Sequence, residues 1–318
     1  MKISLDDLQL FAAVAQAGGF RDAARSGRTS ASGMSQAVRR IETGLGIRLL
    51  NRTTRSVVLT EAGRDLLNKL QPILRELDTA LDVVNGHREQ PRGSLKLNVP
   101  TSAARLVLPS ILPPFLQAFP DITVEVVVDE SFVDVLASGC DAGIRYEERL
   151  EQDMIAVPIG PRVQRFAAAA SPAYLQERGR PTHPRELLDH SCIQGRFASG
   201  ANFTWEFERN EEVVRIEPAA RLVVQVGGAT DLAVEAAQAG VGVVILFEDW
   251  LRPHFQSGSL EPVLEEWWPS FSGPFLYYPG RRLVPAPLRA FLDFIRNNQA
   301  LHERPASKLS RQTSDGNR

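Results

Sequence analysis

The side chains best suited to bind a partner lie together in residues 30–45, SASGMSQAVRRIETGL. Small polar groups come first and arginines follow. Hydroxyl and amide groups hydrogen-bond base edges and arginines neutralise phosphates, so this order is typical of a helix in the major groove of DNA. The expected contacts are Ser30, Ser32, Ser35, Gln36, Arg39 and Arg40.

A second basic cluster follows in residues 51–56, NRTTRS, before the strand-like residues 57–59. This pattern predicts a hairpin whose tip carries Arg52, Thr53 and Arg55 toward phosphates or a minor groove. Residues 1–60 contain nine Lys and Arg against four Asp and Glu, a net charge of +5. The whole chain is −2, so the remainder is −7. That asymmetry predicts an N-terminal unit that binds a polyanion.

The elements that must position these side chains can be inferred from periodicity. Apolar residues from Leu5 to Ala15 share one helical face, and Gly18-Gly19 ends that helix. A short second helix follows, and Ser30 can cap a third one. The third helix buries one stripe, consisting of Met34, Val38, Ile41 and Leu45. Three helices and a hairpin predict a winged helix-turn-helix over residues 1–60. The alternative is an ordinary small helical subdomain, and the basic hairpin favours DNA binding.

A long helix is expected next, capped by Thr60 and ending near Gly86, with Pro72 inside it. Its apolar residues form one seam at intervals of three and four. Such a one-sided helix needs a partner, either a second copy of itself or the chain's own N-terminal domain. We expect dimerisation through Leu66, Leu70, Ile73, Leu77 and Leu81.

Residues 85–93 are polar with Gly and Pro and predict a hinge within a 61–92 linker. Beyond it, strand and helix patterns alternate, which predicts an α/β domain over 93–298 with parallel sheets. Strands are expected at 94–99, 122–128, 141–145, 154–159, 165–170, 221–226, 241–246 and 275–278, with a hairpin from 205–207 and 213–216. Helices are expected at 105–119, 131–138, 172–178, 184–188, 230–239 and 286–297.

Several residues in this region are placed to hold a ligand. Hydroxyl groups at helix starts expose backbone N–H groups to an anion, although they can also be simple caps. Arg145 could pair a carboxylate, or form a salt bridge with a nearby acid. A small organic acid is the favoured ligand. The expected ligand contacts are Thr101, Ser102, Ser131, Arg145, Phe203 and Thr230.

Other functional classes find no support in the 318 residues. The hydrophobic share of 43% and charged share of 23% are ordinary for a globular protein. No apolar run suggests a membrane span or a signal peptide, so a cytoplasmic location is expected. Metal, cofactor and catalytic motifs are not found, and no enzyme activity is expected. Cys140 and Cys192 are interpreted as buried thiols, with a redox pair as the alternative.

The N-terminal pattern resembles the LysR-type transcriptional regulators. The matching residues include Leu8, Phe11, Gly19-Phe20, Ala23-Ala24, Ser30, Met34-Ser35, Val38 to Glu42, Leu45-Gly46, Leu49, Asn51 to Arg55 and Leu59 to Gly63. Two positions depart from the family pattern, since Gly27 stands where a large apolar residue is usual and Leu50 where Phe is common. Residues 141–145, 170–175, 205–207 and 239–242 match the family's effector domain, a relative of type 2 periplasmic binding proteins.

The resemblance implies two α/β subdomains, one of about 93–162 with 270–298 and the other of about 163–269. The chain would cross between them near 161–168 and 266–277. It implies promoter DNA, a small-molecule effector, a dimer or tetramer and RNA polymerase as partners, and a linker helix that pairs two subunits. The polar tail, 299–318, is expected to be disordered. The rival hypothesis is a solute-binding or small-molecule-processing protein in which residues 93–298 carry the function.

Overall fold

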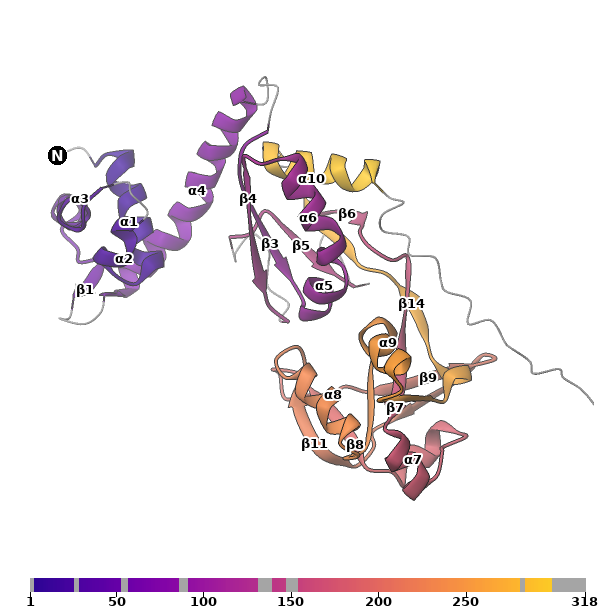
Figure 1. The fold of residues 1–318 in the computed structure, drawn as a ribbon. Coiled ribbons are helices and arrows are strands. Elements are labelled where there is room, and N and C mark those ends of the chain that lie inside the picture. The colour runs from indigo at the N-terminus through magenta and orange to yellow at the C-terminus, as the bar shows by residue number, and fades with distance from the viewer. Residues whose placement is uncertain are drawn as a thin grey trace, which may run out of the picture. The chain divides into compact units, whose positions relative to one another are not determined.

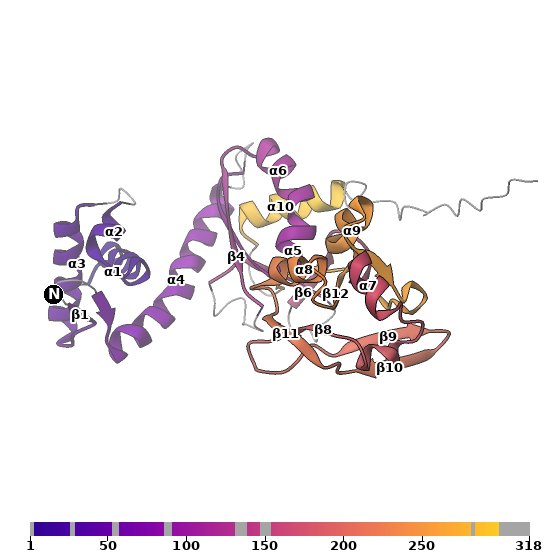
Figure 2. The same cartoon turned by 60° about the horizontal axis from the view of Figure 1, so that its bottom comes forward.

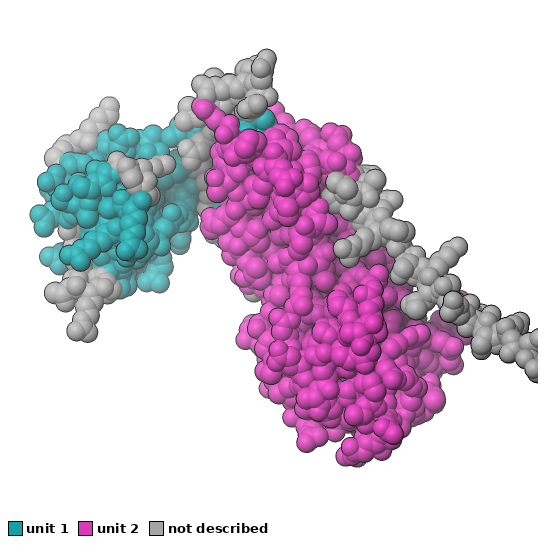
Figure 3. Space-filling view, viewed as in Figure 1, with its two compact units in different colours: residues 1–91, 134–139, 283–286 teal, residues 92–133, 140–282, 287–318 magenta. Residues whose placement is uncertain are grey.

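The computed structural model describes residues 3–25, 29–52, 57–85, 91–130, 139–146, 154–280 and 284–298. The chain divides into two compact units (Figure 3). The first consists of residues 1–91 with the short segments 134–139 and 283–286, and the second of residues 92–133, 140–282 and 287–318. Within the described ranges, no helix is long and apolar enough to cross a membrane. The expected helix at 131–138 and the tail at 299–318 lie outside the described residues.

The first unit has the expected helices and hairpin (Figure 1). Ser30 caps α3 by accepting the N–H of Gly33 at 3.2 Å, and Thr60 caps α4 by accepting the N–H of Gly63 at 3.0 Å, so both predicted caps are confirmed. The elements are α1 (Leu5–Ala17), α2 (Phe20–Ala24), α3 (Ala31–Leu45), the antiparallel pair β1 (Leu50–Arg52) and β2 (Val57–Leu59), and α4 (Glu61–Asn85).

The core of the first unit forms where α1, α3 and the start of α4 meet. Phe11 of α1 and Met34 and Ile41 of α3 are fully buried there. The predicted stripe of α3 is correct except at Leu45, which is 45% exposed. The helix ends at this residue, and Gly46 turns the chain into the left-handed region. The side chain of Leu45 therefore lies beyond the core.

The second unit contains two sheets (Figures 1 and 2). The first sheet has the order β4-β3-β5-β15-β6 and is covered by helices whose phenylalanines pack together, with the rings of Phe115 and Phe291 5.0 Å apart. Its strands are β3 (Gly93–Val99), β4 (Ile122–Val128), β5 (Ala142–Arg145), β6 (Met154–Pro158) and β15 (Phe275–Pro279), and its helices are α5 (Thr101–Leu106), α6 (Leu108–Ala118) and α10 (Ala286–Asn297).

The second sheet has the order β11-β8-β12-β7-β13, with β14 also paired to β7. Alternate residues of β7 enter two separate cores, one under α7 and the β9–β10 hairpin and the other under α8 and α9. The strands of this sheet are β7 (Val163–Ala170), β8 (Cys192–Arg196), β11 (Ala220–Gln225), β12 (Val243–Phe247), β13 (Glu261–Val263) and β14 (Ser270–Ser272), while β9 (Trp205–Arg209) and β10 (Glu212–Ile216) form a separate antiparallel pair. The helices are α7 (Pro172–Arg178), η1 (Pro184–Leu188), α8 (Thr230–Gln238), α9 (Glu248–Ser257) and η2 (Glu265–Trp267).

The chain passes between the two sheets twice, and the two crossings lie side by side. The first lies between β6 and β7 and the second between β14 and β15, and they exchange backbone hydrogen bonds from Gly273 to Arg162 at 2.9 Å and from Ile159 to Pro274 at 3.0 Å. A Cβ on Gly273 would lie 1.6 Å from the carbonyl oxygen of Pro161, so only glycine fits. These crossings connect the two sheets, and we refer to them as the hinge.

Three expectations for this unit were wrong. The sheets are mixed rather than parallel, because β7 and β15 enter directly from the crossings and pair antiparallel with their neighbours. The helix expected at 105–119 is two helices, which start at Thr101 and break at Val107. The strands β8, β13 and β14 and the helix α9 were not predicted, and α9 contains Pro253, a residue type that disfavours helix interiors.

Candidate DNA-binding surface and ligand site

The outer face of α3 presents the polar side chains that the sequence indicated. Ser32, Gln36 and Arg39 are exposed, and Ser35 is partly buried. The opposite face is fixed in the core by Met34 and Val38. The side chains best placed to reach a duplex are therefore held on a rigid helix.

Several of the expected DNA contacts have partners within the chain. The hydroxyl of Ser30 caps α3 and lies 2.9 Å from that of Ser32. Arg40 makes a two-point contact with Asp7 of α1, Nε to Oδ2 at 3.1 Å and Nη2 to Oδ1 at 2.5 Å. Its guanidinium holds the pKa of the Asp7 carboxyl below the usual value and gains a raised pKa in return. Arg40 thus fixes α3 to α1, a role that the sequence did not indicate.

The hairpin is anchored to both neighbouring helices. The carboxylate of Glu42 in α3 accepts the N–H groups of Leu49 and Leu50 at 2.9 and 3.1 Å. On the other side, Gly63 of α4 approaches Leu49 so closely that a Cβ would lie 2.0 Å from its carbonyl oxygen. Arg52 belongs to β1, whereas its side chain, Thr53 and Arg55 lie outside the described residues.

The apolar seam of α4 has two parts, one packed in the core of the first unit and one left on the surface. Leu70 is buried and Leu66 packs in the same core as Phe11. This is the packing on the chain's own domain that the sequence left open. Ile73 is 57% exposed and Leu77 is partly buried, while the side chain of Leu81 is not among those described. The first two leucines therefore serve the fold of this unit, and an apolar face continues beyond them.

The position expected to hold a ligand anion is occupied by the chain itself. The N–H of Thr101 donates to the Glu130 carboxylate at 2.7 Å, and the Thr101 hydroxyl donates to the Gly227 carbonyl at 3.1 Å. A Cβ on Gly227 would lie 2.2 Å from Glu130 Oε1, so the missing side chain makes room for the carboxylate. An organic acid at this position would have to displace Glu130.

Arg145 also has a use inside the fold. It is buried, and its guanidinium donates to the Asn98 side-chain oxygen at 2.5 Å and to the Ile144 carbonyl at 2.7 Å. These bonds join β5 to β3. Arg145 therefore serves the fold, its expected ligand contact stays a prediction, and Ser131 lies outside the described residues.

Five aromatic side chains gather where the crossings meet β12, and we call them the aromatic cluster. Phe203, expected to line the ligand site, is one of them, with its ring 5.2 Å from that of Phe166. Other centroid distances are 4.8 Å from Phe166 to Phe247, 4.9 Å from Phe166 to Phe271 and 5.2 Å from Tyr146 to Phe247. All five side chains are only partly buried, so ring surface remains accessible. The cluster consists of Tyr146, Phe166, Phe203, Phe247 and Phe271.

Buried polar atoms without a hydrogen-bond partner border this cluster. Gln164 is 5% exposed, and neither its amide nitrogen nor its oxygen has a partner. Gln194 is 2% exposed and donates to the Phe203 carbonyl at 2.7 Å, but its oxygen has no partner. The Tyr146 hydroxyl has no well-aligned partner, with the side chains of Ser102 and Gln164 close by, and burial raises the pKa of Tyr146 to about 12. Native proteins pair nearly all buried polar groups, so such a concentration points to a binding site.

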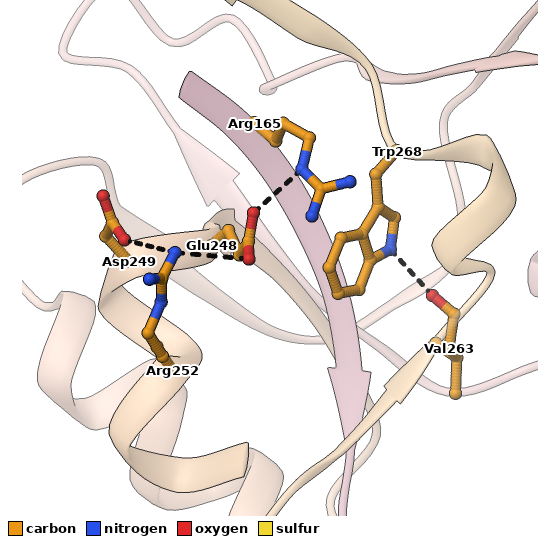
Figure 4. Close-up of polar contacts among 6 residues, drawn as sticks. All are labelled: Arg165, Glu248, Asp249, Arg252, Val263 and Trp268. Atoms are coloured by element: carbon orange, nitrogen blue, oxygen red, sulfur yellow. Dashed lines mark hydrogen bonds and ion pairs between the residues drawn. The ribbon is translucent and has the colours of Figure 1, made fainter. Parts of the chain in front are cut away.

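Two cations near the hinge, Arg165 and Arg252, are already paired (Figure 4). Arg165 donates to Glu248 at 2.8 Å and lies over the Trp268 ring, 5.2 Å from its centroid. Arg252 contacts Glu248 at 3.3 Å and Asp249 at 2.7 Å. The positive charges of both arginines are therefore neutralised by carboxylates of α9.

Comparison with known proteins agrees with this architecture. Residues 5–64 match the family described as bacterial regulatory helix-turn-helix protein, LysR family, and residues 88–300 match the LysR substrate binding domain. The chain belongs to the LysR family. The HTH-type transcriptional regulator YcaN of Escherichia coli (strain K12) is 39% identical over 94% of this chain and 97% of its own length.

Two further LysR relatives extend the likeness. The HTH-type transcriptional regulator PgrR of Escherichia coli (strain K12) is 34% identical over 93% of this chain and 98% of its own. The solved structure of CrgA, a LysR-type transcriptional regulator from Neisseria meningitidis, matches with a TM-score of 0.57 and 26% identity over 95% of this chain and all of its own. This LysR protein is a DNA-binding transcriptional regulator with an effector domain, and not an enzyme.

Sequence reasoning missed several residues of this LysR chain that lie at the candidate ligand site. Gln164, Gln194 and Tyr146 have no motif, because a glutamine or tyrosine in a strand region looks the same whether it faces water or a ligand. Glu130 was overlooked because it follows β4 by two residues and contacts Thr101 only through the fold. The cysteines are buried as interpreted, and burial raises the pKa of the Cys192 thiol to about 12.

Proposed function

We propose that this protein controls a promoter by laying the exposed face of α3 in the major groove of DNA. The observation that carries the proposal is the pairing of an exposed polar face with a buried apolar one on the same helix. Ser32, Ser35 and Gln36 are assigned to base edges and Arg39 to phosphates. The hairpin residues Arg52, Thr53 and Arg55 are assigned to the flanking backbone or minor groove. Ser30 and Arg40 support the helix from within the fold.

Assembly is assigned to the outer half of the α4 seam. Ile73 and Leu77 continue the apolar face after Leu70 has entered the core of the DNA-binding unit. A second copy of α4 would cover this face, with Leu81 extending the contact. A dimer presents two copies of α3, which two half-sites on the DNA require. A tetramer would arise from two such dimers.

Regulation is assigned to the aromatic cluster and the polar groups beside it. Ser102, which neighbours Tyr146, would contribute a hydroxyl, while Thr101 and Thr230 stand at helix starts nearby. A ligand there would contact both subdomains and the hinge between them. Because a ligand shifts an equilibrium only through its different affinity for two states, binding would favour one arrangement of the subdomains and of the assembly. The change would be read out at the promoter by RNA polymerase in the cytoplasm.

The experiment that tests this proposal measures DNA binding of the full chain. A gel-shift assay would use fragments upstream of the gene itself and of its neighbours. We expect a specific complex, with Ser32→Ala and Gln36→Ala changing the preferred sequence by about 1–3 kcal/mol at individual base pairs. The matched control is Gln16→Ala, which removes an exposed glutamine of α1. Equal binding to all fragments, with no change in either variant, would reject α3 as the reader of sequence.

A further inference from the structure

We infer that the ligand of this site is a flat, uncharged molecule with a carboxamide-like group, and not an organic acid. The inference rests on the proposed function, since it names the ligand class of the same site. Three features support this inference. They are the unpaired amide atoms beside the aromatic cluster, the charges around the cluster and its accessible ring surface.

The first feature is the hydrogen-bonding character of Gln164. Its amide carries an acceptor and donors side by side, and they are buried without a well-aligned partner, although the Tyr146 hydroxyl lies close by. The natural complement of a primary amide is another amide-like edge, which offers a donor and an acceptor in matching positions. Gln194 adds an unpaired acceptor oxygen and Tyr146 a hydroxyl. An unpaired buried polar group costs roughly 1–3 kcal/mol, so a ligand that satisfies several of them gains that free energy on binding.

The second feature is the balance of charge. Glu130 holds the start of α5, and its carboxylate and that of Asp249 both act electrostatically on Tyr146. The nearby arginines are engaged, Arg165 with Glu248 and Arg252 with Glu248 and Asp249. A ligand carboxylate would therefore meet like charges, while these two arginines are already neutralised by carboxylates of α9. An uncharged group meets no such penalty.

The third feature is the shape of the surface. The rings of Phe166, Phe247 and Phe271 lie within 6 Å of one another and remain partly exposed. In the β7–β14 ladder Phe271 is directly opposite Gln164, and in the β12–β7 ladder Phe247 is opposite Phe166. Alternate residues of β7 share a face, so the amide and the rings face the same side. A planar ligand can stack on the rings while its polar edge reaches Gln164.

The test uses benzamide and benzoate, two planar probes of nearly equal size that differ in charge. Calorimetric titration or saturation-transfer NMR on the full chain would compare their dissociation constants. We expect benzamide to bind at least about tenfold more tightly than benzoate, which corresponds to about 1.4 kcal/mol. In Gln164→Leu the preference should fall to near one, through loss of benzamide affinity.

A matched control distinguishes a ligand role from a structural one. Gln238→Leu removes another glutamine of the same unit, whose amide is hydrogen-bonded to Ser259 at 2.9 Å. We expect this control to lower the melting temperature and keep the benzamide preference. Gln164→Leu should leave the melting temperature of the unliganded chain unchanged or higher, because it removes an unpaired amide.

The possible failures separate the two proposals. Tighter binding of benzoate, lost in Gln164→Leu, would overturn the ligand class but keep the site. Binding of both probes that Gln164→Leu does not change, or no binding of either at millimolar concentration, would overturn the site itself. A lower melting temperature in Gln164→Leu than in Gln238→Leu would show that the amide serves the fold.

Discussion

The division of the α4 seam predicts that two neighbouring substitutions have opposite consequences. Leu70 is 5% exposed and packs with Phe11 and Ile41, whereas Ile73, three residues later, is 57% exposed. Leu70→Ala should therefore unfold the DNA-binding unit more easily and leave the dimer interface in place. Ile73→Asp should do the reverse.

The magnitudes follow from burial. A buried Leu→Ala change costs about 2–5 kcal/mol, and each kcal/mol lowers the melting temperature of a unit of this size by about 4–8 °C. Leu70→Ala should therefore lower the transition of the first unit by at least roughly 10 °C. An exposed substitution changes stability by about 0.5 kcal/mol or less, so Ile73→Asp should melt almost as the parent does. Its charge would instead be buried between two helices of a dimer, which costs several kcal/mol of association.

The assay exploits the distribution of tryptophans. All four lie in the second unit, at positions 205, 250, 267 and 268, so fluorescence follows that unit alone. Circular dichroism at 222 nm also follows the helices of the first unit. Leu70→Ala should shift only the dichroism transition, and sedimentation at low concentration should show monomers for Ile73→Asp. Monomers of a stable Leu70→Ala protein, or dimers of Ile73→Asp, would refute the division of the seam.

Three further outcomes are expected. Gly63→Ala should lower the dichroism transition by at least several degrees, since overpacking costs about 1–3 kcal/mol; an unchanged transition would refute the tight approach to Leu49. Cys192 of the native protein should resist thiol reagents at pH 8, because a thiol with a pKa of about 12 is scarcely ionised, and rapid labelling of Cys192 would contradict its burial. The Asp7 carboxyl has a lowered pKa, so its contribution to stability is present above the ordinary value of 3.8 and is lost as pH falls through the lowered one; Arg40→Ala should thus melt below the parent at pH 7, and the gap should close in acid.

Sequence periodicity was most informative where one physical requirement dominates. The helices and caps of the first unit follow from apolar spacing and from Ser30 and Thr60, whose hydroxyls have few other uses at those places. The α/β pattern of the second unit also emerged from alternating segments. The direction of its strands did not, because β7 and β15 run against their neighbours only as a result of where the crossings enter the sheets.

Individual roles were harder to predict where a side chain has two plausible partners. Arg39 and Arg40 are adjacent and identical in type, yet only Arg40 faces Asp7, which lies 33 positions away. Arg145 has a guanidinium that could bind a carboxylate, but in the fold it donates a hydrogen bond to Asn98. Sequence spacing cannot decide between such partners, because the choice depends on which elements the fold brings together.

The central claim is that the exposed face of α3 binds DNA, and the salt dependence of binding tests it most directly. Arg39→Ala should lower the slope of log K against log salt by about 0.9 for each phosphate that is no longer neutralised, so by about 1.8 for a dimer. Arg40→Ala should keep the parent slope, because the Arg40 guanidinium is paired with Asp7, and so should the control Arg178→Ala in the second unit. An unchanged slope in Arg39→Ala, or an equal decrease in Arg40→Ala, would contradict the account.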